Sequence, residues 1–341
     1  MEKESPKNSV LSKFNSSVTD KKTPFGILDC IGNTPLVLLK RLFSSASIQL
    51  YGKMEMFNPG GSIKDRTAFN IITKAIESGE INGYTTIIES TSGNMGIGLA
   101  RICHYYGLRL ILVTDPHINP LTEKILKTFQ AEIVKVHQND GMGGYLKSRL
   151  EKVEELLSLE SNSFCPDQYH NFNSPLAHVE TYREICESLG KAPDYIFIAT
   201  STCGTLRGFA EAAAERNEFP KLIAVDAEGS VVFGREPNVR IIPGMGASRP
   251  SDFLIRNQVA DVIHISDRAC IEGCQMLLDL ESILAGGSSG AIVMALEKML
   301  PNIPANSTVV ALFPDSGERY MDTIFSDSWV EEKFGVVNEM V

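Results

Sequence analysis

Short apolar runs alternate with segments of helical spacing along this chain, and this alternation limits its possible folds more than any other feature. The runs are rich in β-branched residues, which is typical of strands buried on both faces of a parallel sheet. They are Thr85–Glu89, Leu108–Thr114, Glu132–Val136, Tyr195–Thr200, Leu222–Asp226, Val262–Ile265 and Thr308–Pro314. The helical patterns are Asp65–Ser78, Asn94–Tyr106, Thr122–Phe129, Tyr145–Leu157, Leu176–Leu189, Leu206–Glu215, Arg268–Leu280 and Ile292–Met299. This order predicts an α/β fold with right-handed crossovers.

The length of 341 residues suits two domains or one large one. The polar, turn-rich tract Glu160–Asn173 is the best candidate for a crossing between two α/β units. The first 24 residues are rich in Ser and Lys, and we interpret them as a disordered extension. No stretch approaches the roughly 18 consecutive apolar residues of a membrane span, so we expect no membrane partner.

Charge and metal-binding residues narrow the class of function. The net charge of −10 argues against nucleic acid or an anionic membrane as the main partner, because both are polyanions. The seven cysteines are scattered, which suits a reducing cytoplasm. The six histidines lack the spacing of metal ligands, so we expect no metal site.

In α/β folds, ligands gather where strands end and helices begin. The junction Asn58–Arg66 has a turn-forming Asn-Pro-Gly-Gly run that delivers Lys64 to the start of a predicted helix. A lysine amine can act as a nucleophile or a base once burial or a nearby cation lowers its pKa. We therefore interpret Lys64 as a reactive amine.

Two further junctions are rich in hydroxyl groups. Thr91, Ser92 and Asn94 lie between a predicted strand and a predicted helix, where N–H groups and hydroxyls could bind a carboxylate. The residues Ser201–Thr205 repeat the arrangement and could bind a phosphate monoester. The alternative for both is an ordinary helix start, where small polar residues serve as caps.

The stretch Gly286–Gly290 matches Gly-x-Ser-x-Gly, the nucleophile elbow of α/β-hydrolases. A serine hydrolase with Ser288 as nucleophile is therefore an alternative of a different class. In that fold the histidine follows the serine, but the last histidine here is His264. This order counts against a hydrolase. A further interpretation of Gly286–Gly290 is a helix start that requires small residues.

Together these stretches resemble the fold-type II pyridoxal-phosphate enzymes of the cysteine synthase family, from about Phe25 to the C-terminus. The segment Gly32–Leu36 is similar to the family's N-terminal motif, and Asn58–Arg66 is similar to its lysine motif. The resemblance implies pyridoxal 5'-phosphate as cofactor, held by Lys64 as a Schiff base and contacted near its phenolic oxygen by Asn94. It also implies that Ser288 faces the pyridine nitrogen. The cofactor phosphate would bind Ser201, Thr202, Cys203, Gly204 and Thr205, and the substrate carboxylate would bind Thr91, Ser92, Asn94 and Gln168.

The family's architecture implies two open twisted sheets flanked by helices, as in the tryptophan synthase β-like fold. We expect a smaller, mobile domain over residues 57–171, which carries Lys64 and the substrate-carboxylate loop. Residues 25–56 and 172–341 would form the larger, cofactor-binding domain. The resemblance further implies a cytoplasmic homodimer that acts on small amino-acid substrates.

Several departures from the cysteine synthase pattern concern the substrate. Met95 replaces a threonine, the phosphate loop has fewer glycines, and the segments Leu284–Gly287 and Pro243–Arg249 differ. One set of segments resembles instead a branch of the family that joins O-phospho-L-serine to L-glutamate through an aminoacrylate intermediate. The set comprises Pro243–Arg249, Gly143–Leu146 followed by Arg149, the pair Gln168 and Tyr169, and Asp226–Ser230. The product, N-(2-amino-2-carboxyethyl)-L-glutamate, is a 2,3-diaminopropionate precursor for siderophores. Cysteine synthesis from O-acetylserine or O-phosphoserine with sulfide stays the alternative, and an inactive binding relative is a third.

A phosphate leaving group carries nearly two negative charges, so its pocket should hold a cation and hydroxyl donors. The candidates are Arg149, Tyr169 and Ser201. Arg149 could equally be a solvated charge on a helix, and Tyr169 a packed loop aromatic. Arg249 either binds a carboxylate of glutamate or lies on the surface.

Overall fold

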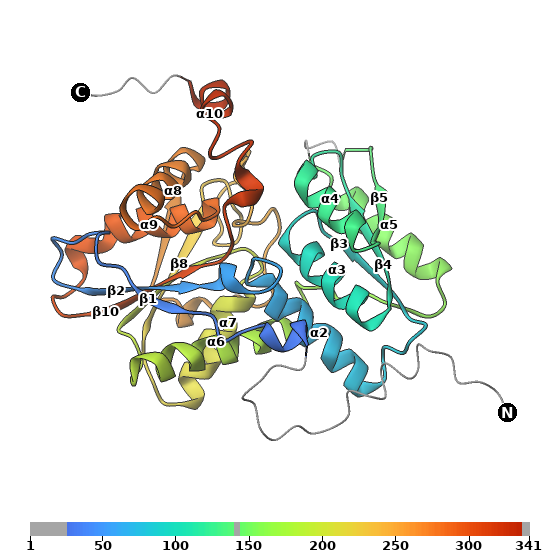
Figure 1. The fold of residues 1–341 in the computed structure, drawn as a ribbon, viewed down its shortest axis with the longest axis horizontal. Helices are drawn as coiled ribbons and strands as arrows, with labels where there is room; N and C mark the ends of the chain where they lie inside the picture. The colour runs from blue at the N-terminus through green and yellow to red at the C-terminus, as the bar shows by residue number, and fades with distance from the viewer. Residues whose placement is uncertain (1–25, 140–143, 336–341) are drawn as a thin grey trace. The chain divides into compact units, whose positions relative to one another are not determined.

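The computed structural model describes residues 26–139 and 144–335, and Figure 1 shows their fold. The extension predicted over the first 24 residues lies outside the described residues. The chain divides into two compact units. Unit 1 comprises Met1–Ile31 and Lys64–Asn173, and unit 2 comprises Gly32–Ile63 and Ser174–Val341. The domain boundaries predicted from the sequence, and the mobility of the smaller domain, stay predictions.

Unit 1 is built on a parallel sheet with strand order β5-β4-β3-β6. Its strands are β3 (Thr86–Ser90), β4 (Arg109–Thr114), β5 (Glu132–Lys135) and β6 (Ser163–Phe164). Its helices are the 3₁₀ turn η1 (Ile27–Cys30), α2 (Lys64–Ser78), α3 (Asn94–Tyr106), α4 (Pro120–Thr128) and α5 (Leu146–Leu159). Local signals set several helix ends: Asn119 accepts hydrogen bonds from the first N–H groups of α4, and Gly107 ends α3 in the left-handed conformation.

Helices cover both faces of the unit 1 sheet. Successive side chains of a strand point to opposite faces, and the two buried clusters follow that rule. Ile87 belongs to the cluster formed with α2, α3 and α4, whereas its neighbour Ile88 belongs to the cluster formed with Val153 of α5. Burial on both faces explains why these strands have continuous apolar runs.

Unit 2 contains a sheet with strand order β1-β2-β10-β7-β8-β9, in which only the edge strand β1 runs antiparallel. The strands are β1 (Leu36–Leu38), β2 (Gln49–Met54), β7 (Tyr195–Ala199), β8 (Lys221–Ala227), β9 (Asp261–Ile265) and β10 (Thr308–Phe313). The helices are α6 (Asn173–Leu189), α7 (Gly204–Glu215), α8 (Asp267–Glu281), α9 (Gly287–Met299) and α10 (Asp327–Phe334), with 3₁₀ turns η2 (Glu55–Phe57), η3 (Arg256–Gln258), η4 (Leu300–Asn302) and η5 (Glu318–Tyr320). Figure 1 shows α8 and α9 on one side of this sheet and α6 and α7 on the other.

The predicted alternation of strands and helices is confirmed, and most ends agree within a few residues. The helix predicted from Ile292 begins earlier, at Gly287. The strands β1, β2 and β6 and the helix α10 were not predicted. In β2 the apolar pattern is interrupted by Gly52 and by Lys53, whose side chain is fully buried. Nothing in the sequence alone marks a lysine as buried, because its partner lies far along the chain.

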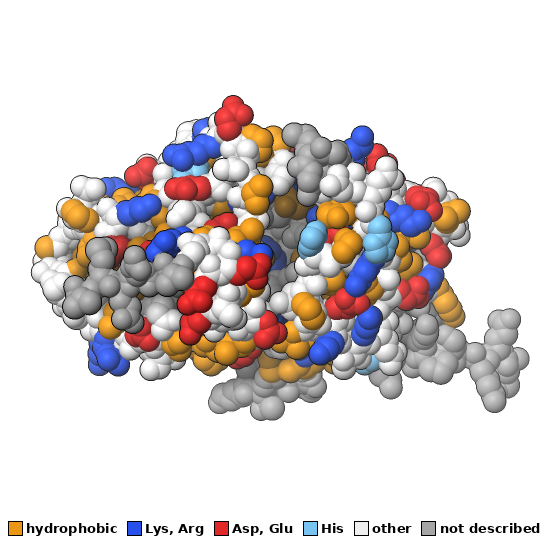
Figure 2. All heavy atoms as spheres, turned by 90° about the horizontal axis from the view of Figure 1, so that it is seen from above, with side chains coloured by type: hydrophobic (Ala, Val, Ile, Leu, Met, Phe, Trp, Pro, Cys, Tyr) orange, Lys and Arg blue, Asp and Glu red, His pale blue; other side chains and the backbone are white. Residues whose placement is uncertain are grey.

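The distribution of charged side chains on the surface and the apolar character of the helices indicate which partners the protein could have. On the face seen in Figure 2, acidic and basic side chains are interspersed, and neither sign forms a continuous patch. Among the described residues, no helix combines the length and apolar character that crossing a bilayer requires.

Candidate functional site

Lys64 is the first residue of α2 and is half-buried in unit 1. The turn before it closes where the Gly61 N–H donates to the Asn58 carbonyl oxygen, 2.7 Å away. Gly61 has a φ of +76°, which a residue with a side chain adopts only under strain. The predicted glycine turn that presents Lys64 at a helix start is therefore confirmed, and the amine's chemical role stays a prediction.

The first turns of α2 and α3 pack closely within unit 1. A side-chain carbon at Gly98 of α3 would lie 3.2 Å from the Lys64 carbonyl oxygen and 3.1 Å from Ala68 Cβ. Since α2 begins at Lys64 and α3 at Asn94, this approach brings the N-terminal ends of both helices together. Two of the residues singled out in the sequence thus come from adjacent helix starts.

The Thr91–Asn94 loop follows β3 and leads into α3. The Thr91 N–H donates to Val113 O of β4 (3.2 Å), and the Gly93 N–H donates to Thr91 Oγ1 (3.4 Å). Thr91 is buried, whereas Ser92 and Asn94 are half-buried. N–H groups of a helix's first turn have no partners inside the helix, and the helix dipole favours an anion there. The loop therefore has the chemistry of a carboxylate site.

Arg149 of α5 pairs with Asp115, which directly follows β4 at the same carboxyl edge of the sheet. Arg149 Nη1 lies 3.1 Å from Asp115 Oδ2, and the two side chains are 17% and 12% exposed. Arg149 is therefore not the solvated helix charge of the alternative interpretation. Its buried Nε has no hydrogen-bond acceptor among residues 26–139 and 144–335. A guanidinium with an unused donor can receive an additional anion.

Gln168 and Tyr169 lie in the turn after β6 and are half-buried. The turn is closed by Asp167, whose φ is +41° and whose Oδ1 accepts a hydrogen bond from the Tyr169 N–H (3.4 Å). Because β6 pairs with β3 in parallel, this turn lies at the same carboxyl edge as the Thr91–Asn94 loop. The roles predicted for both side chains stay predictions.

In unit 2, the residues Ser201–Thr205 connect β7 to α7. Thr202 and Cys203 are buried, and Cys203 has a φ of +61°. That conformation explains why a glycine-rich sequence suits this position, and why Cys203 is a departure with a conformational cost. A side-chain carbon at Gly204 would lie 2.9 Å from Ser174 Oγ, so α6 and α7 meet closely beneath the loop.

A second loop that the sequence did not reveal braces Ser201–Thr205. The Gly246 N–H donates to Thr200 O (2.6 Å), and Ser201 Oγ donates to Gly246 O (3.1 Å). Ser251 Oγ donates to Thr202 O. The sequence singled out Pro243–Arg249 as a glycine- and serine-rich junction and as a departure from a family pattern, but it did not indicate that this segment contacts Ser201–Thr205. No local sequence pattern predicts these contacts, because they join residues about 45 positions apart.

Ser288 lies in the first turn of α9 and is 1% exposed. A side-chain carbon at Gly244 would lie 3.6 Å from Ser288 Oγ, so the absence of a side chain there leaves room in front of the hydroxyl. At Gly290, a side-chain carbon would lie 1.9 Å from Cys270 O of α8. Helix packing therefore explains Gly290, and close contacts with Asp315 and Ile242 explain Gly286 and Gly287. Ser288 also lacks the positive φ of a strained elbow, which counts against the hydrolase alternative.

The structure reveals one further set of polar residues in unit 2. Lys53, Glu55, Asn58 and Glu184 are each at most 6% exposed and join the Gly32–Leu36 motif in a hydrogen-bonded network. The only sequence signal was a lysine within an apolar stretch just before the glycine turn.

Comparisons with known proteins agree on the class. Residues 27–315 match the family model described as pyridoxal-phosphate dependent enzyme. The N-(2-amino-2-carboxyethyl)-L-glutamate synthase of Ralstonia nicotianae is 43% identical over 307 residues, which cover 89% of this chain and 90% of the relative.

Solved structures give the same result. Cysteine synthase from Entamoeba histolytica superposes with a TM-score of 0.85 at 30% identity, over 96% of this chain and 95% of its own. O-ureido-L-serine synthase superposes with a TM-score of 0.82 at 29% identity, over 90% of this chain and 99% of its own. The predicted fold class, cofactor and family are thus confirmed. A match over nearly the whole described chain, in sequence and in fold, shows that this protein belongs to the pyridoxal-phosphate-dependent enzymes.

Proposed function

We propose that the protein joins O-phospho-L-serine to L-glutamate, which forms N-(2-amino-2-carboxyethyl)-L-glutamate and releases phosphate. The observation that carries this proposal is the similarity to the synthase of Ralstonia nicotianae along nearly the full length of both chains. The alternative is cysteine synthesis with sulfide as the second substrate. Its support is the similarity to cysteine synthase from Entamoeba histolytica, at lower identity.

The residues present fit the cofactor. The start of α7 offers backbone N–H groups and the hydroxyls of Thr202 and Thr205 to a phosphate, and the Ser201 hydroxyl joins them when it turns from Gly246 O to the ligand. The room that Gly244 leaves in front of the buried Ser288 hydroxyl suits a flat ring that presents a nitrogen. Lys64 is the residue that we assign as the covalent anchor. When bound, pyridoxal phosphate supplies the electron withdrawal that makes the α-proton of an amino acid acidic and its β-substituent a leaving group.

The remaining steps are assigned to the chain's own residues. The start of α3, with Thr91, Ser92 and Asn94, binds the α-carboxylate of the substrate and fixes its orientation. The Lys64 amine takes the α-proton of O-phosphoserine and returns a proton to the same carbon at the end of the reaction. Between these transfers, the bond from Cβ to the phosphate oxygen breaks. A new bond then forms from Cβ to the glutamate nitrogen, which loses a proton.

We assign the departing phosphate to Arg149, supported by Tyr169 and Ser201. Asp115 holds the guanidinium at Nη1, and the buried Nε is unsatisfied within the described part of the chain. An anion that accepts from Nε would satisfy this donor, and burial strengthens the interaction. Gln168 adds an amide donor for the substrate carboxylate, and Arg249 is assigned to a carboxylate of glutamate.

The decisive experiment offers the purified enzyme O-phosphoserine or O-acetylserine, each with glutamate or sulfide. We expect phosphate release and the carbon–nitrogen product to be fastest with O-phosphoserine and glutamate, measured by phosphate assay and mass spectrometry. Faster turnover of O-acetylserine with sulfide would contradict the proposal and favour cysteine synthesis. Turnover of none of the four combinations would instead indicate an inactive relative.

The anchor is tested separately. Wild-type protein should show the visible absorption of a lysine-bound pyridoxal, and Lys64→Ala should lose it together with about 10³-fold or more of the activity. Ser288→Ala should keep the visible absorption, because we assign Ser288 to the ring nitrogen. A Lys64→Ala variant that kept the wild-type spectrum would refute the assignment.

The proposal also covers the cellular compartment and the oligomeric state of the enzyme. We place the enzyme in the cytoplasm, since all seven cysteines are free and most of them are buried. We also propose that it forms a homodimer, by its likeness to the cysteine synthase family. Molar mass in solution tests this: a mass near that of a single 37.4 kDa chain would contradict it.

A further inference from the structure

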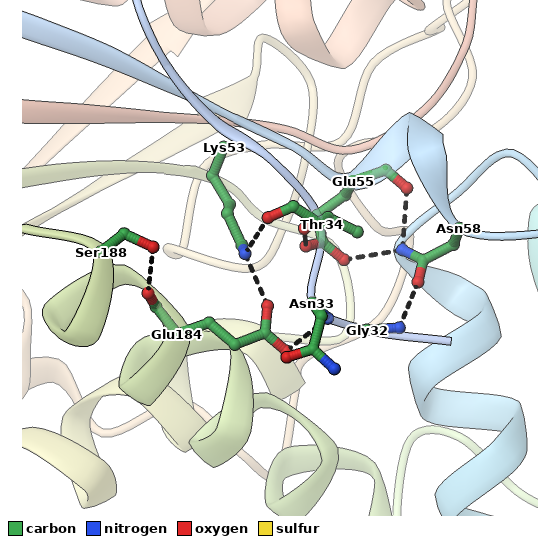
Figure 3. Close-up of polar contacts among 8 residues, drawn as sticks. All are labelled: Gly32, Asn33, Thr34, Lys53, Glu55, Asn58, Glu184 and Ser188. Carbon is green, nitrogen blue, oxygen red and sulfur yellow. Dashed lines mark hydrogen bonds and ion pairs between the residues drawn. The ribbon is translucent and has the colours of Figure 1, made fainter. Parts of the chain in front are cut away.

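A buried polar network in unit 2 connects the Gly32–Leu36 motif to the loop that leads to Lys64. Figure 3 shows its side chains converging from β2, η2 and α6. At its centre, Lys53 Nζ lies 2.5 Å from Glu184 Oε2, and the two side chains are 1% and 6% exposed. Buried ion pairs contribute little net stability, because desolvation offsets their attraction. A role in fixing one specific backbone arrangement is therefore more consistent with this pair than a role in stability.

The ion pair holds the backbone of the motif. Lys53 Nζ also donates to Thr34 O (2.7 Å), and Glu184 Oε1 accepts from the Asn33 N–H (2.9 Å). Asn33 has a φ of +49°, and Gly32 before it has a φ of +91°. Gly32 adopts its positive φ without a steric clash, whereas Asn33 carries a conformational cost that surrounding contacts must offset. The two charges supply those contacts.

The motif in turn holds Asn58. The Gly32 N–H donates to Asn58 Oδ1 (2.8 Å), and Asn58 Nδ2 donates to Glu55 Oε2 (2.9 Å). Glu55 Oε1 accepts from Thr34 Oγ1 (2.6 Å), which closes the network. Asn58 is 3% exposed, so its amide is fixed in orientation from both ends.

Asn58 begins the turn that ends at Lys64. Its carbonyl oxygen accepts the Gly61 N–H (2.7 Å), and the far end of the segment is fixed where the Ile63 N–H donates to Pro314 O (2.8 Å). The segment after β10 also holds the loop where the Ser316 N–H donates to Gly61 O (3.2 Å) and where Arg319 donates to Gly60 O. The lysine loop is therefore held by the segment after β10 on one side and by the buried network on the other. Only the second anchor depends on the Gly32–Leu36 motif.

We propose that the Gly32–Leu36 motif, Lys53, Glu184, Glu55 and Asn58 form a positioning network that sets the geometry of the lysine loop and hence the reactivity of Lys64. The motif then acts through Asn58 on the loop. This inference rests on Lys64 as the cofactor anchor and is independent of which amino acids react. Its test therefore uses the cofactor and not the product.

The test compares three variants of the full-length enzyme. Asn58→Ala removes the connection between network and loop, and K53M/E184Q removes both charges while a Gln oxygen can still accept from Asn33. Tyr182→Phe is the matched control: it removes a part-buried hydrogen bond of α6, from Tyr182 Oη to Glu218 (2.8 Å), which lies outside the network. The measurements are the dissociation constant for pyridoxal phosphate, the pH at which the visible absorption of the holoenzyme titrates, and kcat and KM.

We expect Asn58→Ala and K53M/E184Q to raise the dissociation constant about 10-fold or more, to move the pH of the spectral titration, and to lower kcat with little change in KM. The melting temperature is measured for all three variants as well. Tyr182→Phe should lower it about as much as the network variants do, without moving the pH of the spectral titration. The proposal is overturned if the network variants keep the wild-type titration and cofactor affinity, or if they match the control in every measurement. If Asn58→Ala does not fold, K53M/E184Q alone decides between these outcomes.

Discussion

Two loops of this enzyme look alike in sequence and are held in different ways. The unit 1 loop, Thr91–Asn94, and the unit 2 loop, Ser201–Thr205, each follow a buried strand and lead into a helix. The hydrogen bonds given above for the unit 1 loop run to the neighbouring strand and within the loop. The unit 2 loop is also braced by Gly246 and Ser251 from a distant segment.

The difference matches the ligands that we assign. A resident cofactor benefits from a preorganised site, and the contacts of Gly246 and Ser251 preorganise the loop that we assign to its phosphate. The comparison shows that the local sequence sets the strand–loop–helix form of both loops. Contacts with distant residues decide how firmly a loop is held before any ligand binds.

We expect the largest loss of stability from a substitution that disrupts the packing of α6 against α7 beneath the unit 2 loop. A side-chain carbon at Gly208 of α7 would lie 2.2 Å from Pro175 O, a backbone atom that cannot move away without shifting α6. Gly208→Ala should lower the free energy of unfolding by about 3 kcal/mol and weaken cofactor binding strongly. Chemical denaturation measures the first effect and cofactor titration the second.

The matched control is Gly98→Ala, at a helical glycine of α3 in unit 1. Its nearest contacts would be 3.1 to 3.3 Å, and the helix gains about 1 kcal/mol from alanine, so the two effects roughly cancel. Equal losses of stability in both variants would remove the contrast in how tightly the two helix starts are packed.

The brace itself is tested by Ser251→Ala. The variant leaves the buried Thr202 carbonyl without this donor, which should cost about 1–2 kcal/mol, or about 10-fold in cofactor affinity. The KM for the amino-acid substrates should stay within about 2-fold. A change in KM with unaltered cofactor affinity would show that the brace serves the substrate site instead.

Thr91→Val is the corresponding change in the unit 1 loop. It keeps the shape of the side chain and removes the hydroxyl, so we expect the KM for O-phosphoserine to rise about 5-fold to 10-fold. Cofactor affinity should not change. Steady-state kinetics and cofactor titration on the same preparation separate the two sites, and a loss of cofactor in Thr91→Val would argue against their division of labour.

The smallest effect concerns pH and the strands beside the unit 2 loop. Burial, and then the charge of Arg235, lower the pKa of His264 on β9 from its ordinary value of 6.5. The unfolded chain therefore binds this proton more readily, and stability falls as the pH drops below about 6.5 towards the folded-state pKa. The neighbouring Asp226 has its pKa raised by burial and opposes that trend.

His264→Gln should flatten the decline of the melting temperature between about pH 6.5 and pH 5. A comparable titration of Thr91→Val, whose substitution is remote from β9 in the sequence, serves as the reference. If His264→Gln follows the wild-type curve, the pH sensitivity of unit 2 must come from other groups.

Local sequence was sufficient for the strands and helices of the α/β pattern and for the helix-start loops. Short β-branched runs and helical spacing depend on neighbours a few residues apart, so they can be read directly. The glycine turn before Lys64 and the hydroxyl-rich starts of α3 and α7 are also local. The resemblance to a known family then supplied the cofactor, which those patterns alone left open.

The tertiary structure decided what depends on distant residues. It buried Lys53 of strand β2 against Glu184, 131 positions away. It paired Arg149 with Asp115 and tied Ser251 to Thr202. Charge, burial and bracing depend on which segments the fold brings into contact, and a one-dimensional pattern does not contain that information. The sequence by itself determined the kind of fold and the helix starts that we assign to anion binding, and the tertiary structure determined which polar groups hold those helix starts in place.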